Sequence, residues 1–269
     1  MKIKLPDFSL AYDDAGQGLP LVLVHGYPLN RRMWQPQLRG LQDTARILAV
    51  DLRGHGDSQA TPAPYSMDLF ADDLNAFLEA LGIDQKVVLC GLSMGGYITF
   101  AFYRKYPHRL AGLILTATRA AADTPAQREA RDQAAETARQ GNTASIFNSM
   151  LPRLLTPKTY AEKPALVARV RKIMEHVSLE GILGDLSAMK ERPDSTPTLA
   201  RIDIPTLFLP GANDQIIPLQ EAQGMHTAVH GSQLEIIPEA GHLLNLENPR
   251  LFNRAVRRFL RETIDHGKV

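Results

Sequence analysis

The chain has 269 residues, of which 44% are hydrophobic, and its formal net charge at pH 7 is +1. This length suits one large domain or a core with an insertion, and the near-zero charge gives no reason to expect nucleic acid or an anionic membrane as a partner. No run approaches the roughly 20 apolar residues of a membrane-spanning helix. The N-terminus lacks the apolar segment of a signal peptide, and the single cysteine, Cys90, excludes an intramolecular disulfide. We therefore expect a cytoplasmic protein.

Strand and helix patterns alternate through the first part of the chain. The alternation of Phe8, Leu10 and Tyr12 predicts a half-exposed strand, and Met67 to Leu81 has the spacing of a helix with one apolar face. This alternation predicts an α/β fold with a mainly parallel central sheet covered by helices on both faces. Further strands are predicted at 19–24, 47–50, 87–90 and 110–116, with a helix at 96–106.

The composition changes at about Thr118, and from there to about Pro197 no strand-like run occurs. Residues rich in good helix formers predict an all-helical segment, with helices at 121–139, 146–155, 164–176 and 179–190. We interpret this segment as a cap inserted between two sheet strands, over the carboxyl ends of the sheet. The predicted division is a first core part at 1–117, a helical cap at 118–197 and a second core part at 198–269. The second core part contains strands at 204–209 and 234–237 and helices from 219 and from 249 to 262.

The run Gly91-Leu92-Ser93-Met94-Gly95 stands between a predicted strand and a predicted helix. A G-x-S-x-G sequence in that context is typical of a nucleophile elbow, in which the serine occupies a strained turn and its hydroxyl projects above the sheet edge. Ser93 is therefore the predicted nucleophile. The backbone N–H of Met94 is then in position to stabilise a developing oxyanion.

An acid and a base follow further along the chain, each after a predicted strand. Asp214 follows the strand at 204–209, and His242 follows the strand at 234–237. The carboxyl ends of strands are where open α/β sheets place their sites, so Asp214 is preferred over Asp203, which precedes its strand, and over Asp194, which lies in the cap. We expect His242 to take the proton of the serine and Asp214 to orient the imidazole.

The chain order Ser93, Asp214, His242 resembles that of the α/β-hydrolase superfamily. The stretch Val24 to Pro28, the segment Asp51 to Ser58 and the final Gly-His pair match that superfamily in the same order. Within it, the chain is most similar to small bacterial carboxylesterases and enol-lactonase-like hydrolases. The resemblance implies that the second oxyanion donor is the backbone N–H of Tyr27.

Other residues near the predicted site loops or in the cap are candidates for binding the substrate or for ordering the loops. Leu29, Met150, Leu151 and Leu243 are apolar residues near the site loops or in the cap, and are candidates for a substrate pocket. Arg31 and Arg32 follow the loop that contains Tyr27, and their positive charges would be compatible with an anionic ester or lactone as substrate. His25 is interpreted as ordering its loop, and His55 as a turn or surface residue. No cluster has metal-ligand spacing, so we expect neither a metal nor another cofactor.

These features predict a serine carboxylesterase acting on small, short-chain esters through an acyl-enzyme. An enol-lactone hydrolase would use the same residues, and hydrolysis of carbon–carbon bonds or perhydrolysis would use the same triad. Dehalogenases and epoxide hydrolases of this fold are disfavoured because they need an aspartate where Ser93 stands. A ligand receptor with the hydrolase fold is the non-enzymatic alternative. The sequence carries no signal of the oligomeric state.

Overall fold

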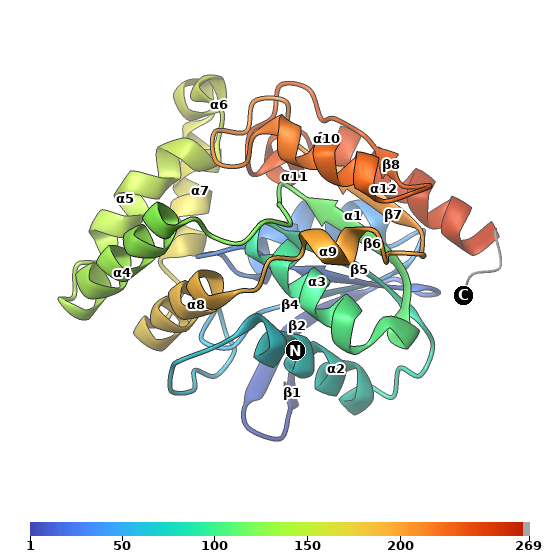
Figure 1. Ribbon diagram of the computed structural model, residues 1–269, viewed down its shortest axis with the longest axis horizontal. Helices are drawn as coiled ribbons and strands as arrows, with labels where there is room; N and C mark the ends of the chain where they lie inside the picture. Colours follow the sequence, from blue (N-terminus) through green and yellow to red (C-terminus); the bar gives the residue numbers. More distant parts are fainter. Residues whose placement is uncertain (266–269) are drawn as a thin grey trace.

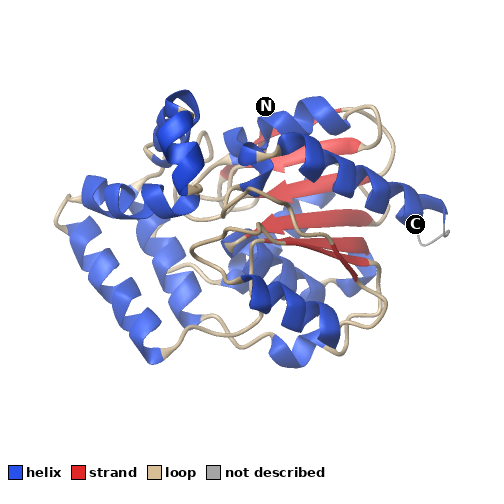
Figure 2. Ribbon diagram, turned by 90° about the horizontal axis from the view of Figure 1, so that it is seen from above, coloured by secondary structure: helices blue, strands red, loops and turns tan. Residues whose placement is uncertain are grey.

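The computed structural model describes residues 1–265, which form one eight-stranded sheet between layers of helices (Figures 1 and 2). The order across the sheet is β1-β2-β4-β3-β5-β6-β7-β8. Strand β2 pairs antiparallel with both of its neighbours, and all other neighbouring pairs are parallel. The strands are β1 (Lys2–Lys4), β2 (Ser9–Ala15), β3 (Pro20–Val24), β4 (Arg46–Val50), β5 (Val87–Leu92), β6 (Leu110–Thr116), β7 (Thr206–Leu209) and β8 (Gln233–Leu234).

The register of the parallel strands brings their carboxyl ends to one level. Val24 of β3 lies beside Gly91 of β5, Leu92 of β5 beside Thr116 of β6, and Thr116 beside Leu209 of β7. All residues of β3, β5, β6 and β7 are buried, as expected for parallel strands covered on both faces. The loops that follow these strands therefore start from one edge of the sheet.

Helices cover both faces of the sheet (Figure 2). Helices α1 and α12 contact each other, as do α2 and α3, while α10 packs near β7 and β8. This arrangement confirms the predicted fold class. The core helices are α1 (Gln35–Leu41), α2 (Met67–Ala80), α3 (Met94–Lys105), α10 (Leu219–Ala228), α11 (Leu244–Glu247) and α12 (Pro249–Asp265), with short 3₁₀ turns at Arg31–Trp34 and Pro107–Arg109.

An all-helical segment connects β6 to β7, as predicted, and its longer helices gather over the carboxyl edge of the sheet (Figure 1). Helix α4 packs against both α8 and α5, and α7 packs against α5 and α6. Thr124 caps the start of this segment: its hydroxyl accepts from the Gln127 N–H while the Gln127 side chain accepts from the Thr124 N–H. The cap helices are α4 (Pro125–Arg139), α5 (Thr143–Leu154), α6 (Pro157–Glu162), α7 (Pro164–Met174), α8 (Leu179–Glu191) and α9 (Thr196–Leu199).

The last strand is shorter than its sequence predicts. The apolar pattern predicts a strand at 234–237, whereas β8 ends at Leu234 and only an isolated bridge joins Gly211 to Ile237. Pro210 stands in the neighbouring strand's extension and has no N–H, so it cannot donate to the ladder at this point. The chain nevertheless continues alongside, because Glu235 donates to Phe208 and Ile237 donates to the Pro210 carbonyl. None of the helices in the described residues combines the length and apolar character needed to cross a bilayer.

Candidate active site

Ser93 lies at the sharp turn between β5 and α3, with φ 56° and ψ −113°. A positive φ is unfavourable for a residue with a side chain and persists only where the surroundings enforce it. Here the Ser93 N–H donates to the Thr116 carbonyl at 2.9 Å, and the Thr118 hydroxyl donates to the Ser93 carbonyl at 2.8 Å. The end of the neighbouring strand β6 thus holds the turn in place.

Glycines give this turn the space it needs. A Cβ on Gly91 would collide with the carbonyl oxygen of Gly95, and a Cβ on Gly95 would collide with that of Val24. A Cβ on Gly26 would stand 3.1 Å from the Cβ of Ser93. The glycines therefore let the elbow approach the end of β3 and its loop closely.

Asp214 and His242 meet at the carboxyl edge of the sheet. The Asp214 Oδ2 lies 2.8 Å from the His242 Nδ1, and the two side chains are 1% and 4% exposed. The other oxygen, Oδ1, accepts from the backbone N–H groups of Ile216 and Ile217 at 2.8 and 3.1 Å. A carboxylate oxygen only accepts hydrogen bonds, so this contact favours the tautomer with the proton on Nδ1 and leaves Nε2 as the accepting nitrogen.

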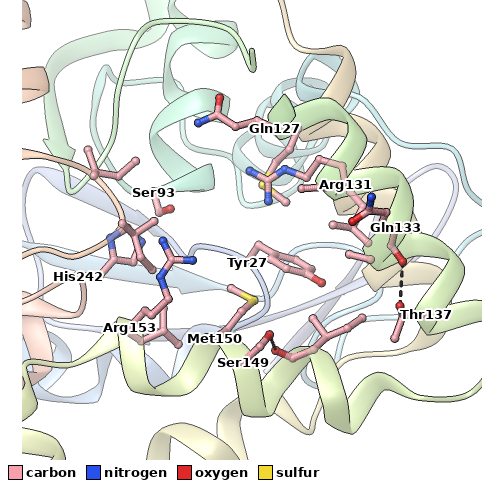
Figure 3. A pocket seen from close by; sticks show the side chains of 18 of the residues that line it. Tyr27, Ser93, Gln127, Arg131, Gln133, Thr137, Ser149, Met150, Arg153 and His242 are labelled. Atoms are coloured by element: carbon pink, nitrogen blue, oxygen red, sulfur yellow. Dashed lines mark hydrogen bonds between the residues drawn. The ribbon is translucent and has the colours of Figure 1, made fainter. Parts of the chain in front are cut away.

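Ser93 and His242 line the same cavity, which has a volume of about 450 Å³ (Figure 3). Its other walls come from the oxyanion loop at Tyr27, from the Asp214 loop at Ile216 and Ile217, and from the cap. The cap contributes side chains from α4, α5 and α8. The cavity therefore lies between the sheet edge and the cap, and its volume suits a small ligand.

The backbone N–H groups of Met94 and Tyr27 are the oxyanion donors that the sequence predicts. Met94 is the first residue of α3, where a helix leaves its N–H groups without intrahelical partners. Tyr27 follows Gly26, and within the described residues its N–H has no hydrogen-bond acceptor. These are the two donors expected from the sequence.

His25, in the loop after β3, is buried and contacts the backbone of two loops. His25 is fully buried, and its Nε2 accepts from the Leu52 N–H at 3.0 Å while Nδ1 lies 3.0 Å from the Gly26 carbonyl. Burial and the nearby His55 hold the pKa of His25 well below its usual range. A neutral imidazole thus joins the β3 loop to the β4 loop, in keeping with the interpretation of His25 from the sequence.

Residues 20–249 match the family described as the alpha/beta hydrolase fold. The chain belongs to the α/β-hydrolase family. An esterase from Thermogutta terrifontis, solved with malate bound, superposes with a TM-score of 0.94 at 42% identity, covering 98% of each chain. The 3-oxoadipate enol-lactonase 2 of Acinetobacter baylyi is 32% identical over 93% of this chain and 92% of its own. A putative non-heme chloroperoxidase of Synechocystis sp. is 29% identical over 94% and 95%. The names of these relatives cover different reactions, so the family alone does not fix the substrate.

Of the four apolar residues that the sequence suggested for the substrate pocket of this α/β-hydrolase, one lines the cavity and three do not. Met150 lines the cavity. Leu29, Leu151 and Leu243 are at most 1% exposed, belong to the hydrophobic core and are not among the residues that line the cavity. An apolar residue next to a site loop packs inward as readily as toward a ligand, and sequence position does not distinguish the two.

The arginines after the oxyanion loop also have other partners. The Arg31 guanidinium pairs with Asp51, Asp57 and Asp13, and Arg32 lies 3.5 Å from Asp57. Neither arginine lines the cavity. Arg31 and Arg32 therefore pair with the protein's own carboxylates and do not face the cavity in which an anionic substrate would bind.

Sequence reasoning missed Glu247, which supports the histidine loop of this α/β-hydrolase. One oxygen accepts from the Gly241 N–H at 2.6 Å, and the other accepts from the N–H and the hydroxyl of Thr156 at 2.8 and 2.9 Å. Glu247 therefore connects the loop of His242 to the cap. Glu247 is the last residue of the short helix α11, and a carboxylate at that position gives no sequence signal for this role.

Within the described residues, no group of three or more histidine, cysteine or carboxylate side chains is arranged to hold a metal ion. The cavity wall consists of polar, aromatic and aliphatic side chains with three arginines.

Proposed function

We propose that the protein is a serine carboxylesterase that cleaves small, short-chain esters. The observation that carries this proposal is the arrangement around the cavity: Ser93 in a left-handed turn at its wall, and His242 beside it with Nδ1 2.8 Å from Asp214. A serine hydroxyl is a weak nucleophile without a base, and His242, which lines the same cavity, is the base in this proposal. The cavity volume supports a small substrate.

In the proposed reaction, the Ser93 Oγ attacks the ester carbonyl while the His242 Nε2 takes its proton. The carbonyl oxygen becomes an oxyanion, which the N–H groups of Met94 and Tyr27 stabilise, each lowering the barrier by about 3–4 kcal/mol. Asp214 stabilises the imidazolium and stays ionised. The carbon–oxygen bond to the alcohol breaks as His242 returns the proton to that oxygen. A water, deprotonated by His242, then attacks the acyl carbonyl. The bond between the acyl carbon and the Ser93 Oγ breaks, His242 returns the proton to Oγ, and the acid leaves.

Enol-lactone hydrolysis is the second candidate. The specific support is the 32% identity to an enol-lactonase over 93% of the chain. A lactone is a cyclic ester, so the same attack opens the ring, and the alcohol product stays joined to the acyl group. The esterase is preferred because the identity to the Thermogutta terrifontis esterase is higher, at 42% over 98% of the chain.

The test is intact-mass labelling of the wild type and of Ser93→Ala with a fluorophosphonate, followed by hydrolysis assays. The assays use p-nitrophenyl esters from acetate to octanoate and one enol-lactone. A single adduct that Ser93→Ala loses, with turnover of short-chain esters, supports the esterase. Lactone turnover that exceeds ester turnover favours the second candidate. Esterase activity retained by Ser93→Ala rejects Ser93 as the nucleophile. No label and no turnover in the wild type rejects the esterase and leaves a receptor as the alternative.

A further inference from the structure

The cavity wall carries an unbalanced positive charge. Three arginines, Arg119, Arg131 and Arg153, are among the residues that line it, and none of the lining residues is an aspartate or a glutamate. Uncharged esters need no cations around them. A cluster of arginines in a partly enclosed site attracts anions and raises their local concentration.

One carboxylate, that of Asp123, neutralises part of this positive charge. Asp123 lies 2.8 Å from the Arg119 guanidinium and 3.1 Å from that of Arg131, and it also pairs with Arg192 at 2.8 Å. Its side chain is fully buried. A single negative charge is therefore shared by three guanidinium groups, two of which line the cavity.

Arg153 has no such partner. It lies near the end of α5, and within the described residues it forms no ion pair. Its one hydrogen bond goes to the Gln215 carbonyl at 3.4 Å. Figure 3 shows its guanidinium directed from the cap toward the end of the cavity that holds Ser93 and His242. An unpaired, planar guanidinium presents the two parallel N–H donors that a carboxylate accepts.

A second, independent feature is the phenol of Tyr27. Tyr27 lines the cavity, yet its hydroxyl is buried and has no hydrogen-bond partner within the described residues. Burial and the nearby Asp185 raise the pKa of Tyr27, so the hydroxyl stays protonated and remains a donor. Buried polar groups are rarely left unpaired, so this donor is available to a ligand oxygen.

We propose that the cavity selects esters that carry a carboxylate, and that Arg153 is the specificity-determining residue that receives it. The proposal rests on the proposed esterase function and names its substrate class. The scissile carbonyl binds at Ser93, while the second acidic group of the acyl chain faces the guanidinium of Arg153. The Tyr27 hydroxyl donates to a substrate oxygen. Arg119 and Arg131, although held by Asp123, add to the positive potential.

The experiment compares two esters of equal shape and different charge. Monomethyl succinate carries a carboxylate where methyl 4-methylpentanoate carries an isopropyl group. Acid release from each ester is followed by titration at constant pH for the wild type, Arg153→Gln, Arg153→Lys and Arg139→Gln. Arg139 is an exposed arginine of the cap that does not line the cavity, so it is the matched control.

We expect the wild type to prefer monomethyl succinate. Arg153→Gln should lower kcat/KM for this ester by about ten-fold, the usual scale of one charge-assisted pair, and change the neutral ester by less than about two-fold. Arg153→Lys should recover part of the loss, and Arg139→Gln should match the wild type. Added salt should reduce the preference of the wild type more than that of Arg153→Gln, because salt screens the charge.

Two results would overturn the inference while leaving the esterase in place. One is wild-type turnover of the neutral ester that equals or exceeds that of monomethyl succinate. The other is a preference for monomethyl succinate that persists unchanged in Arg153→Gln. Failure of the proposed function gives a different pattern, in which the wild type hydrolyses neither ester and takes no fluorophosphonate label.

Discussion

At the scale of single residues, Asp214 uses its two oxygens for different purposes. Oδ1 accepts from the N–H groups of Ile216 and Ile217 and so fixes its own loop, and Oδ2 faces His242. The geometry of the imidazole thus depends on a side chain whose orientation the backbone sets. A substitution can therefore remove the negative charge at this position while the backbone bonds still hold the side chain in place.

Asp214→Asn should therefore leave the fold intact and impair turnover. The amide can still accept from the loop with its oxygen, but its NH₂ group then faces Nδ1 and moves the imidazole proton to Nε2, which can no longer take the proton of Ser93. We expect kcat to fall by about 10³–10⁴. Steady-state kinetics on a p-nitrophenyl ester and thermal unfolding measure the two effects.

Asp203→Asn is the control for that experiment. Asp203 lies before the amino end of β7, at the opposite end of the strand from the Asp214 loop, and its carboxylate is 3.2 Å from the Tyr103 hydroxyl. Its replacement should leave kcat unchanged. A larger loss of kcat in Asp203→Asn than in Asp214→Asn would contradict the assignment of the acid.

The site residues differ in how far sequence alone predicts them. Ser93, Asp214 and His242 follow strand patterns, and a parallel sheet brings strand ends together, so their proximity follows from the fold. Arg153 carries no such signal, because its relation to the cavity depends on how the cap packs over the sheet. The ion pairs of Arg31 could not be predicted either. The carboxylates that pair with it are 18 to 26 positions away along the chain, so the sequence left Arg31 as a candidate for binding an anionic substrate.

At the scale of secondary structure, two glycines inside helices have opposite surroundings. Gly224 lies in α10, and a Cβ added there would meet nothing within 4 Å. Gly184 lies in α8, and a Cβ there would collide with the ring of Tyr65. Helix propensity favours alanine at both positions, and packing permits it at only one.

Gly224→Ala should raise the free energy of unfolding by about 0.5–1 kcal/mol, because alanine loses less backbone entropy than glycine when a helix forms. Gly184→Ala should lower it, since α8 would have to move away from the core. Urea unfolding of both variants gives the comparison. Equal changes in the two variants would mean that propensity, rather than the contact with Tyr65, decides the outcome.

At the scale of the whole molecule, the sequence predicts the sheet better than the attachment of the cap. The apolar runs and the elbow predict a mainly parallel sheet and the helical insertion between the strands at 110–116 and 204–209. His55, in contrast, is interpreted from sequence as a turn or surface residue, whereas the structure buries it completely. A short Gly-His-Gly sequence predicts a turn correctly but does not reveal that the cap covers it.

The turn at His55 is one of the places where the cap joins the core. The Ser178 N–H donates to the Gly54 carbonyl at 2.9 Å, and the Gly56 N–H donates to the His176 carbonyl at 2.7 Å. Between them, the His55 Nε2 lies 3.0 Å from Asp185 of α8, and both side chains are fully buried. The His55 Nδ1 lies 3.0 Å from the Arg53 carbonyl, so an acceptor faces each ring nitrogen, and this arrangement favours the protonated imidazole.

Breaking this buried pair on one side should cost more than removing both charges. His55→Gln leaves the Asp185 carboxylate buried without a cation, and we expect it to lower the free energy of unfolding by about 3–5 kcal/mol. In the double variant His55→Gln with Asp185→Asn, two neutral amides replace the charges. Its loss should be clearly smaller than the sum of the two single losses. Additive losses would show that the two groups do not interact.

The pH dependence of this contribution follows from the same contacts. Burial alone would lower the pKa of His55, but Asp185 and the Arg53 carbonyl raise it above its ordinary value of 6.5, and burial raises the pKa of Asp185 above 3.8. A raised pKa in the folded state stabilises the protein below the unfolded value and ceases to do so as the pH rises through the folded value. The stability of the wild type relative to the double variant should therefore decrease from pH 6 to pH 9, as His55 loses its proton. Urea unfolding at both pH values measures this difference, and an increase over that range would mean that His55 is neutral in the folded protein.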